Sequence, residues 1–140
     1  MMRRSYTLLA LLAFFSAGCE EKYPTYAAFC DQNKTQPPSC LHYAVLGVKD
    51  KKRLESLFGL QDEEACPYRV ELTRYHIGLC DHPIVKSVGS DFNGYVRLEI
   101  KKGFKCYYKI QSDFKNDENA AFERVAKKLE KEWSLQNIPN

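Results

Sequence analysis

The sequence has no apolar stretch long enough to cross a membrane as a helix, and it has little excess charge of either sign. Its longest apolar run, residues 6–18, contains 13 residues, whereas a helix that spans roughly 30 Å of hydrocarbon needs about 20. The formal net charge is +3, and a dedicated nucleic-acid-binding protein normally has a much larger basic excess. We therefore expect neither a permanent transmembrane helix nor a nucleic-acid partner.

Catalytic and metal-binding signatures are also missing. The sequence contains no G-x-S-x-G, no H-E-x-x-H, no phosphate-binding glycine loop and no C-x-x-C pair. His42, His76 and His82 lack the spacing of zinc ligands. Cys80 and His82 resemble a thiol beside its base, but nucleophile and base usually come from distant segments, and His42 and His76 suit structural positions on strands. We expect no enzymatic activity, no metal and no cofactor other than a covalent lipid.

The amino terminus carries a pattern of its own. Arg3 and Arg4 precede the apolar run, which ends in the small residues Ser-Ala-Gly at 16–18. A basic start, a short apolar middle and a small-residue end are typical of a secretory signal. An ordinary signal of this kind would leave Cys19 available for a disulfide.

Residues 16–19, Ser-Ala-Gly-Cys, resemble the lipobox of bacterial lipoproteins, with Ser16 where that family prefers leucine. The resemblance implies that the signal peptide, residues 1–18, is cleaved and that Cys19 receives a diacylglycerol and an amide-linked acyl chain such as palmitate. Two or three chains anchor a protein firmly, whereas a single chain binds only marginally. Glu20 stands where inner-membrane lipoproteins of enterobacteria carry aspartate, which implies an outer-membrane anchor facing the periplasm. The resemblance ends at Cys19, and no family is indicated beyond it.

The remaining 122 residues, with 19 basic and 18 acidic side chains, are expected to form one disulfide-braced domain over residues 30–140. Residues 19–29 would be the lipidated tether. Even fully extended it reaches only about 30 Å, so the domain should lie close to the lipid surface.

The cysteine count suits an exported protein, because the periplasm oxidises thiols. If Cys19 carries lipid, five of the six cysteines remain, so one thiol is free or joins a partner. A disulfide between Cys30 and Cys40 would close the polar, proline-containing loop between them. Alternatively, one of the two crosses to Cys66.

The predicted strands restrict the other pairings. Cys66 and Cys80 lie at the two ends of a strand predicted over residues 68–79, which holds them about 40 Å apart. A disulfide needs Cα atoms within about 7 Å. Cys106 is therefore expected to pair with either Cys66 or Cys80.

Alternation and helical periodicity together predict an α+β fold in the order β-α-β-β-β-α, with a mainly antiparallel sheet. The expected strands cover residues 41–48, 68–79, 95–100 and 104–110, with a brief further strand at 84–88. Asp50 should cap the first helix and Gly59 should end it. The C-terminal amphipathic helix packs on the sheet through a periodic apolar face: Phe122, Val125, Ala126, Leu129 and Trp133.

The register of the hairpin determines its two faces. A three-residue turn over residues 101–103 pairs Ile100 with Phe104 and Leu98 with Cys106, which gathers the apolar residues on one face. Cys106 then faces the core. The opposite face is the candidate partner-binding surface, made of Tyr95, Arg97, Lys101, Lys105, Tyr107 and Lys109.

Cations interleaved with tyrosines can hold an anionic partner, although a solvated face whose lysines discourage edge pairing has the same composition. We expect a small lipid-anchored protein-binding module, similar in kind to an immunity protein or an inhibitor. The alternative is a structural accessory lipoprotein of an envelope or secretion assembly.

Overall fold

Five strands and two helices make up the part of the chain that the computed structural model describes, residues 23–77 and 92–136. The elements are β1 (Thr25–Phe29), β2 (His42–Tyr43), α2 (Val48–Phe58), β3 (Tyr68–His76), β4 (Gly94–Lys102), β5 (Lys105–Phe114) and α3 (Glu118–Gln136). The strands form one sheet in the order β1-β5-β4-β3-β2, and only β2 and β3 run parallel. The predicted α+β class is confirmed. The strand expected at 84–88 lies outside the described residues.

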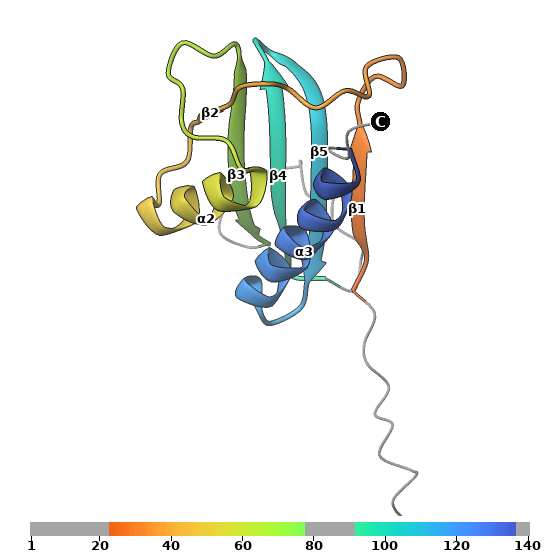
Figure 1. Ribbon diagram of the computed structural model, residues 1–140. Helices are drawn as coiled ribbons and strands as arrows, with labels where there is room; N and C mark the ends of the chain where they lie inside the picture. The colour runs from red at the N-terminus through yellow and green to blue at the C-terminus, as the bar shows by residue number, and fades with distance from the viewer. Residues whose placement is uncertain (1–22, 78–91, 137–140) are drawn as a thin grey trace, which may run out of the picture.

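Both helices lie on the same face of the sheet (Figure 1). The periodic apolar face predicted for the C-terminal helix is buried in α3, from Phe122 at 6% exposure to Leu129 at 0%. Alternate residues of β4 form the opposing surface, because successive side chains of a strand point to opposite faces. These are Val96, Leu98 and Ile100, all fully buried. Helix-on-sheet packing is therefore confirmed, and the sheet face away from the helices is called the open face below.

The capping prediction for α2 is half right. Gly59, with φ of 68°, ends the helix in the left-handed conformation, and its N–H donates to the Glu55 carbonyl at 2.9 Å. The N-cap, however, is Gly47, which makes no side-chain capping bond. Asp50 lies inside the first turn instead.

Arg74 in β3 ties both helices to the sheet. Its guanidinium contacts Asp50 of α2 at 3.1 Å and Glu118 of α3 at 2.8 Å, and it lies 4.8 Å from the centre of the Phe122 ring. His76, two residues further along the same face, also pairs with Glu118. Because these ionic groups are about one-quarter exposed, their attraction is less screened than that of a surface pair.

Part of the predicted tether belongs to the sheet. Residues 25–29 form β1, antiparallel to β5, with Ala27 opposite Ile110 and Phe29 opposite Tyr108. Ala27 and Phe29 pack against the core while Tyr26 is exposed. A five-residue strand with two alanines gives only a weak alternating pattern in the sequence. The strand is defined instead by its pairing with β5.

The strand predicted over residues 41–48 is much shorter. Only His42 and Tyr43 pair with β3, and the Ala44 N–H donates to the Val70 carbonyl at 2.9 Å. The chain then leaves the sheet, and Leu46 is fully exposed. An apolar run alone does not distinguish a strand from an apolar loop that leads into a helix.

The predicted hairpin register is wrong. The turn contains two residues, and Gly103 supplies the positive φ, 61°, that its first position requires. Lys101 lies opposite Cys106, but Ile100 lies opposite Tyr108, so the ladder shifts by one residue at a β-bulge. A bulge places two residues of one strand against one of its partner. Cys106 therefore shares the open face with Lys101 and does not face the core.

The disulfides join Cys30 to Cys106 and Cys40 to Cys66, with Cα–Cα distances of 5.8 and 5.9 Å. The predicted Cys30–Cys40 bond is wrong, and its alternative, a crossing to Cys66, is right. Cys106 pairs with neither Cys66 nor Cys80, which lies outside the described residues.

The unpredicted strand β1 explains the pairing. Because Phe29 lies opposite Tyr108, the chain continues alongside β5, and the Cys30 N–H donates to the Tyr107 carbonyl at 3.0 Å. This places Cys30 beside Cys106.

We expect peptide mapping without reduction to recover these two cross-linked pairs. Replacing Cys40 and Cys66 together by alanine should lower the free energy of unfolding in urea by about 3 kcal/mol, because the bond closes a loop of moderate length. Removing Cys30 and Cys106 should cost about 4 kcal/mol, since that loop is longer. A map that contains a Cys30–Cys40 peptide would contradict the β1–β5 pairing.

Candidate functional site

The bulge separates the residues of the predicted binding surface into two groups. Tyr95, Arg97, Lys101 and Lys109 share the open face, whereas Lys105 and Tyr107 lie at the hairpin tip, beyond or at the irregularity. The hairpin register predicted from the sequence is regular, so it places all six residues on one face.

Two residues of the open-face group are held by internal contacts. Tyr95 is only 7% exposed and stacks on Tyr75 at a ring distance of 5.2 Å. The Arg97 guanidinium lies 4.7 Å from the centre of the Tyr95 ring and donates to the Gln111 Oε1 at 2.9 and 2.7 Å. Neither side chain is presented to a partner.

Lys101 is also neutralised within the open face. Its ammonium contacts Glu71 at 2.6 Å and Glu99 at 4.0 Å, and Arg69 contacts Glu71 from the other side at 2.6 Å. The hydrogen bond from Lys101 holds the pKa of Glu71 below its usual value. Of the four predicted residues on this face, only Lys109 is exposed, opposite Glu99.

The hairpin tip forms one wall of a cleft of about 550 Å³, called the tip cleft here. The other wall is the loop over residues 31–36, and the rings of Tyr68 and Tyr107 and the Cys30–Cys106 disulfide complete the lining. The cleft thus combines side chains from the start of β3, the β4–β5 turn and the loop after β1.

Tyr107 holds the loop against the hairpin. Its hydroxyl donates to the Gln36 carbonyl, and its ring packs edge-on against Tyr68 at 5.0 Å. Burial raises the pKa of Tyr107, so the phenol stays protonated and remains a donor at neutral pH. Together with the Cys30–Cys106 bond, this contact fixes the shape of the cleft.

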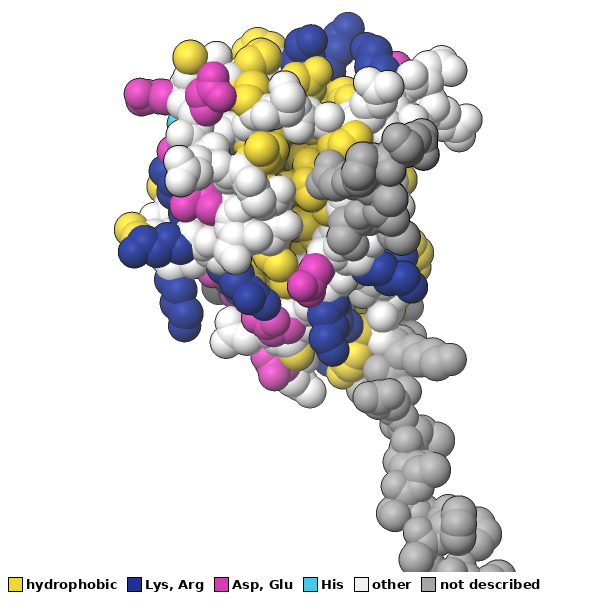
Figure 2. All heavy atoms as spheres, viewed as in Figure 1, with side chains coloured by type: hydrophobic (Ala, Val, Ile, Leu, Met, Phe, Trp, Pro, Cys, Tyr) yellow, Lys and Arg dark blue, Asp and Glu magenta, His cyan; other side chains and the backbone are white. Residues whose placement is uncertain are grey.

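The tip cleft carries an excess of positive charge. Lys34, Lys102 and Lys105 line it with a single carboxylate, Asp31, which lies 3.8 Å from Lys34. The Lys102 ammonium lies 5.2 Å from the centre of the Tyr68 ring. In Figure 2, basic side chains gather at the top of the view, where Figure 1 places the turn between β4 and β5.

Sequence reasoning missed Lys34, Lys102 and Tyr68 as members of this site. The basic turn around Gly103 is visible in the sequence, and it could have suggested Lys102. Lys34 and Tyr68 come from segments whose proximity depends on β1 and on the Cys30–Cys106 bond, and no local pattern indicates it.

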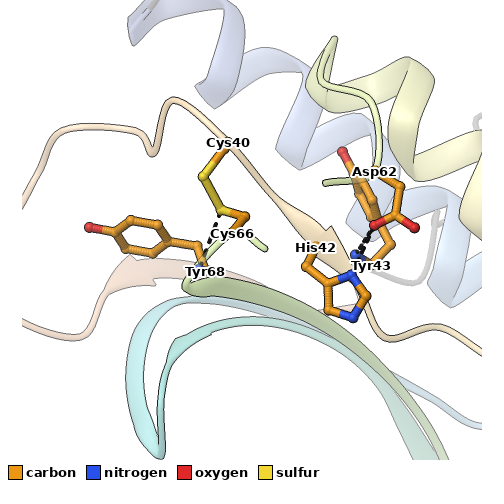
Figure 3. Close-up of a disulfide and its surroundings, with 6 residues drawn as sticks. All are labelled: Cys40, His42, Tyr43, Asp62, Cys66 and Tyr68. Carbon is orange, nitrogen blue, oxygen red and sulfur yellow. Dashed lines mark hydrogen bonds and ion pairs between the residues drawn. A yellow bond between two sulfur atoms is a disulfide. The ribbon is translucent and has the colours of Figure 1, made fainter. Parts of the chain in front are cut away.

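The clusters that contain His42 and His76 join the helices to the sheet. The Asp62 carboxylate accepts the Tyr43 N–H at 2.9 Å and lies 3.0 Å from the His42 Nδ1 (Figure 3). It also pairs with Lys51. Lys51 and the other donors lower the pKa of Asp62 to about 2. The cluster fastens α2 and the loop after it to β2, next to the Cys40–Cys66 bond.

Over residues 23–77 and 92–136, no group of His, Cys, Asp and Glu side chains has the arrangement of a metal site. No helix in those ranges is long and apolar enough to span a bilayer. Cys19, Cys80 and His82 lie outside them.

We expect Asp62→Asn to lower the urea midpoint at pH 7, because Lys51 and His42 lose their charged partner. The depressed pKa of Asp62 stabilises the fold above about pH 4, and this contribution is lost as the pH falls through about 2. The difference between variant and parent should therefore narrow from pH 4 to pH 2. Glu63→Gln, which removes the exposed neighbouring carboxylate, is the control and should leave the midpoint unchanged. A gap that is constant from pH 7 to pH 2 would show that the carboxylate charge is not what stabilises the cluster.

Comparison of this chain with protein-family models, with curated proteins and with solved structures finds no match. The features of the molecule that bear on function are therefore its signal-like amino terminus and the geometry of the tip cleft.

Proposed function

We propose that the protein is a lipid-anchored lipoprotein of the bacterial envelope, and that its domain binds another protein in the manner of an immunity protein or an inhibitor. The lipobox-like residues 16–19 support the anchor. The four cysteines of the described residues are joined in two disulfides, which suits an oxidising compartment such as the periplasm. The outer membrane, with the domain facing the periplasm, is the proposed location.

The observation that carries this proposal is the end of the sheet at which the chain enters it from the Cys19 side. The chain enters β1 at Thr25, opposite Ser112, and reaches Phe29, opposite Tyr108, nearer the hairpin tip. In Figure 1 this entry lies at the bottom of the sheet and the β4–β5 turn lies at the top. Five residues between Cys19 and β1 reach only about 17 Å. Anchoring at Cys19 would therefore hold the base of the sheet at the bilayer and present the tip cleft to the periplasm.

The tip has the features of a binding surface. Phe104 in the turn is fully exposed, and exposed aromatic side chains are enriched at protein–protein contacts. It stands beside the cationic cleft, so apolar and electrostatic attraction are available at the same end of the domain. Charge complementarity of this kind accelerates association and selects partners.

We expect mass spectrometry of the protein purified from envelopes to show a mature chain that begins at Cys19 and carries two or three acyl chains. Cys19→Ala should lose all acyl mass and should leave the membrane fraction or keep its signal segment. A mature chain that begins elsewhere, or one without acyl groups, would overturn the anchor.

The binding end can be located by photo-crosslinking in intact envelopes. A photoreactive phenylalanine analogue at Phe104 should yield an adduct with one protein, because this position is exposed at the tip. The same analogue at Asn116, exposed at the opposite end between β5 and α3, is the matched control and should yield none. Adducts from Asn116 alone would refute the tip as the binding end, and several membrane-protein adducts would favour an accessory of an envelope assembly.

A further inference from the structure

Two like charges face each other at the hairpin tip. Lys102 and Lys105 are direct cross-strand partners, and both are exposed. The Cβ atoms of such a pair are about 5 Å apart, and like charges placed directly opposite one another destabilise a hairpin. Lys34 adds a third cation from the facing loop. The fold therefore keeps an unfavourable charge arrangement at the mouth of its cleft.

The lysine that precedes this pair has a different electrostatic environment. Lys101, one residue before, has two carboxylate neighbours, Glu71 and Glu99. Among the described residues, no carboxylate forms an ion pair with Lys102 or Lys105. An anion bound between the two ammonium groups would relieve their repulsion.

We propose that the tip cleft binds an acidic peptide segment of the partner protein, with neighbouring carboxylates that contact Lys102, Lys105 and Lys34. The inference rests on the proposed protein-binding function and specifies the chemistry of the partner. A cleft of about 550 Å³ lies within the range of sites that enclose drug-sized ligands, so it accommodates a short peptide stretch. The polar side chains of Asn33 and Thr35 line the same wall and can bond to the peptide backbone.

The aromatic residues of the cleft favour a peptide over a sugar. A sugar ring needs an open aromatic face on which to stack. The Tyr68 ring is contacted by the Lys102 ammonium and, in a T-shaped arrangement, by the Tyr107 ring, whose hydroxyl is bonded to the Gln36 carbonyl. The cleft therefore offers positive charge to a ligand, and its aromatic rings position the side chains that carry this charge.

Binding of a fluorescent hexaglutamate peptide to the full-length lipidated protein in detergent micelles tests this inference. The parent protein should bind hexaglutamate more tightly than hexaglutamine, with an affinity that falls as salt rises. Lys102→Gln combined with Lys105→Gln should weaken binding about five- to tenfold, as expected for the loss of a few exposed ion pairs. The matched control combines Lys52→Gln with Lys127→Gln, which removes the same charge from exposed helical positions outside the cleft, and should change affinity less than about twofold.

Three outcomes would overturn the inference. The first is hexaglutamate that binds no better than hexaglutamine. The second is an equal loss of affinity in both double variants, which would mean that overall charge and not the cleft attracts the peptide. The third is a hexamer of galacturonic acid that binds more tightly than hexaglutamate and depends on the same two lysines, which would make the ligand an anionic glycan. Failure of the broader proposal is distinguishable, because crosslinking at Phe104 reports a protein partner whether or not its contact is acidic.

Discussion

One extra residue in β5 determines where the important side chains of this domain lie. Before the bulge, the ladder places Ile100 opposite Tyr108 and Leu98 opposite Ile110, all buried beneath the helices. After it, the alternation of side chains between the two faces is reversed, so Cys106 lies on the open face. There it bonds to Cys30, in the chain that leaves β1. The same reversal lets Tyr107 reach the loop over residues 31–36. A ladder that continued regularly from the Ile100–Tyr108 pair would place Cys106 on the core side and Tyr107 on the open face. The tip cleft would then lose the Cys30–Cys106 disulfide and the Tyr107 side chain.

The rest of the domain is held in place by a few partly buried charges as well as by its core. Helix α2 has Lys49 and Lys51 in its first turn, where positive charge opposes the helix dipole, and it has no side-chain cap. Its position therefore depends on tertiary contacts: Asp50 pairs with Arg74 of β3, and Lys51 pairs with Asp62. The first contact joins the helix to β3, and the second joins it to β2 through Asp62, which accepts the Tyr43 N–H. Strand β2 is paired to β3 through only two residues.

The parts of the fold that are predictable from sequence are those whose signals are local. The face of α3 follows from five apolar residues at helical spacing, and the end of α2 follows from one glycine. The parts that are not predictable depend on partners distant in the chain. Strand β1 is defined by its pairing with β5, the Cys30–Cys106 bond follows from that strand, and the bulge is favoured by core packing against both helices. The candidate site behaves likewise: the predicted surface includes Lys105 and Tyr107, but through a register that is wrong, and only the assembled sheet brings Lys34 and Tyr68 beside them.

The proposed anchor and the charge of the tip bear on each other. Strand β5 has ten residues and is therefore about 33 Å long, whereas charges in physiological salt interact over roughly 8 Å. A domain held by its base at a bilayer would carry Lys102 and Lys105 several screening lengths from its own lipid headgroups. Lysines at that distance contribute little to membrane adhesion. Their mutual repulsion would then be relieved only by a ligand that arrives from the periplasmic side. In the proposed arrangement, the anchor would therefore determine where the cleft is presented, and the cleft alone would determine what is bound.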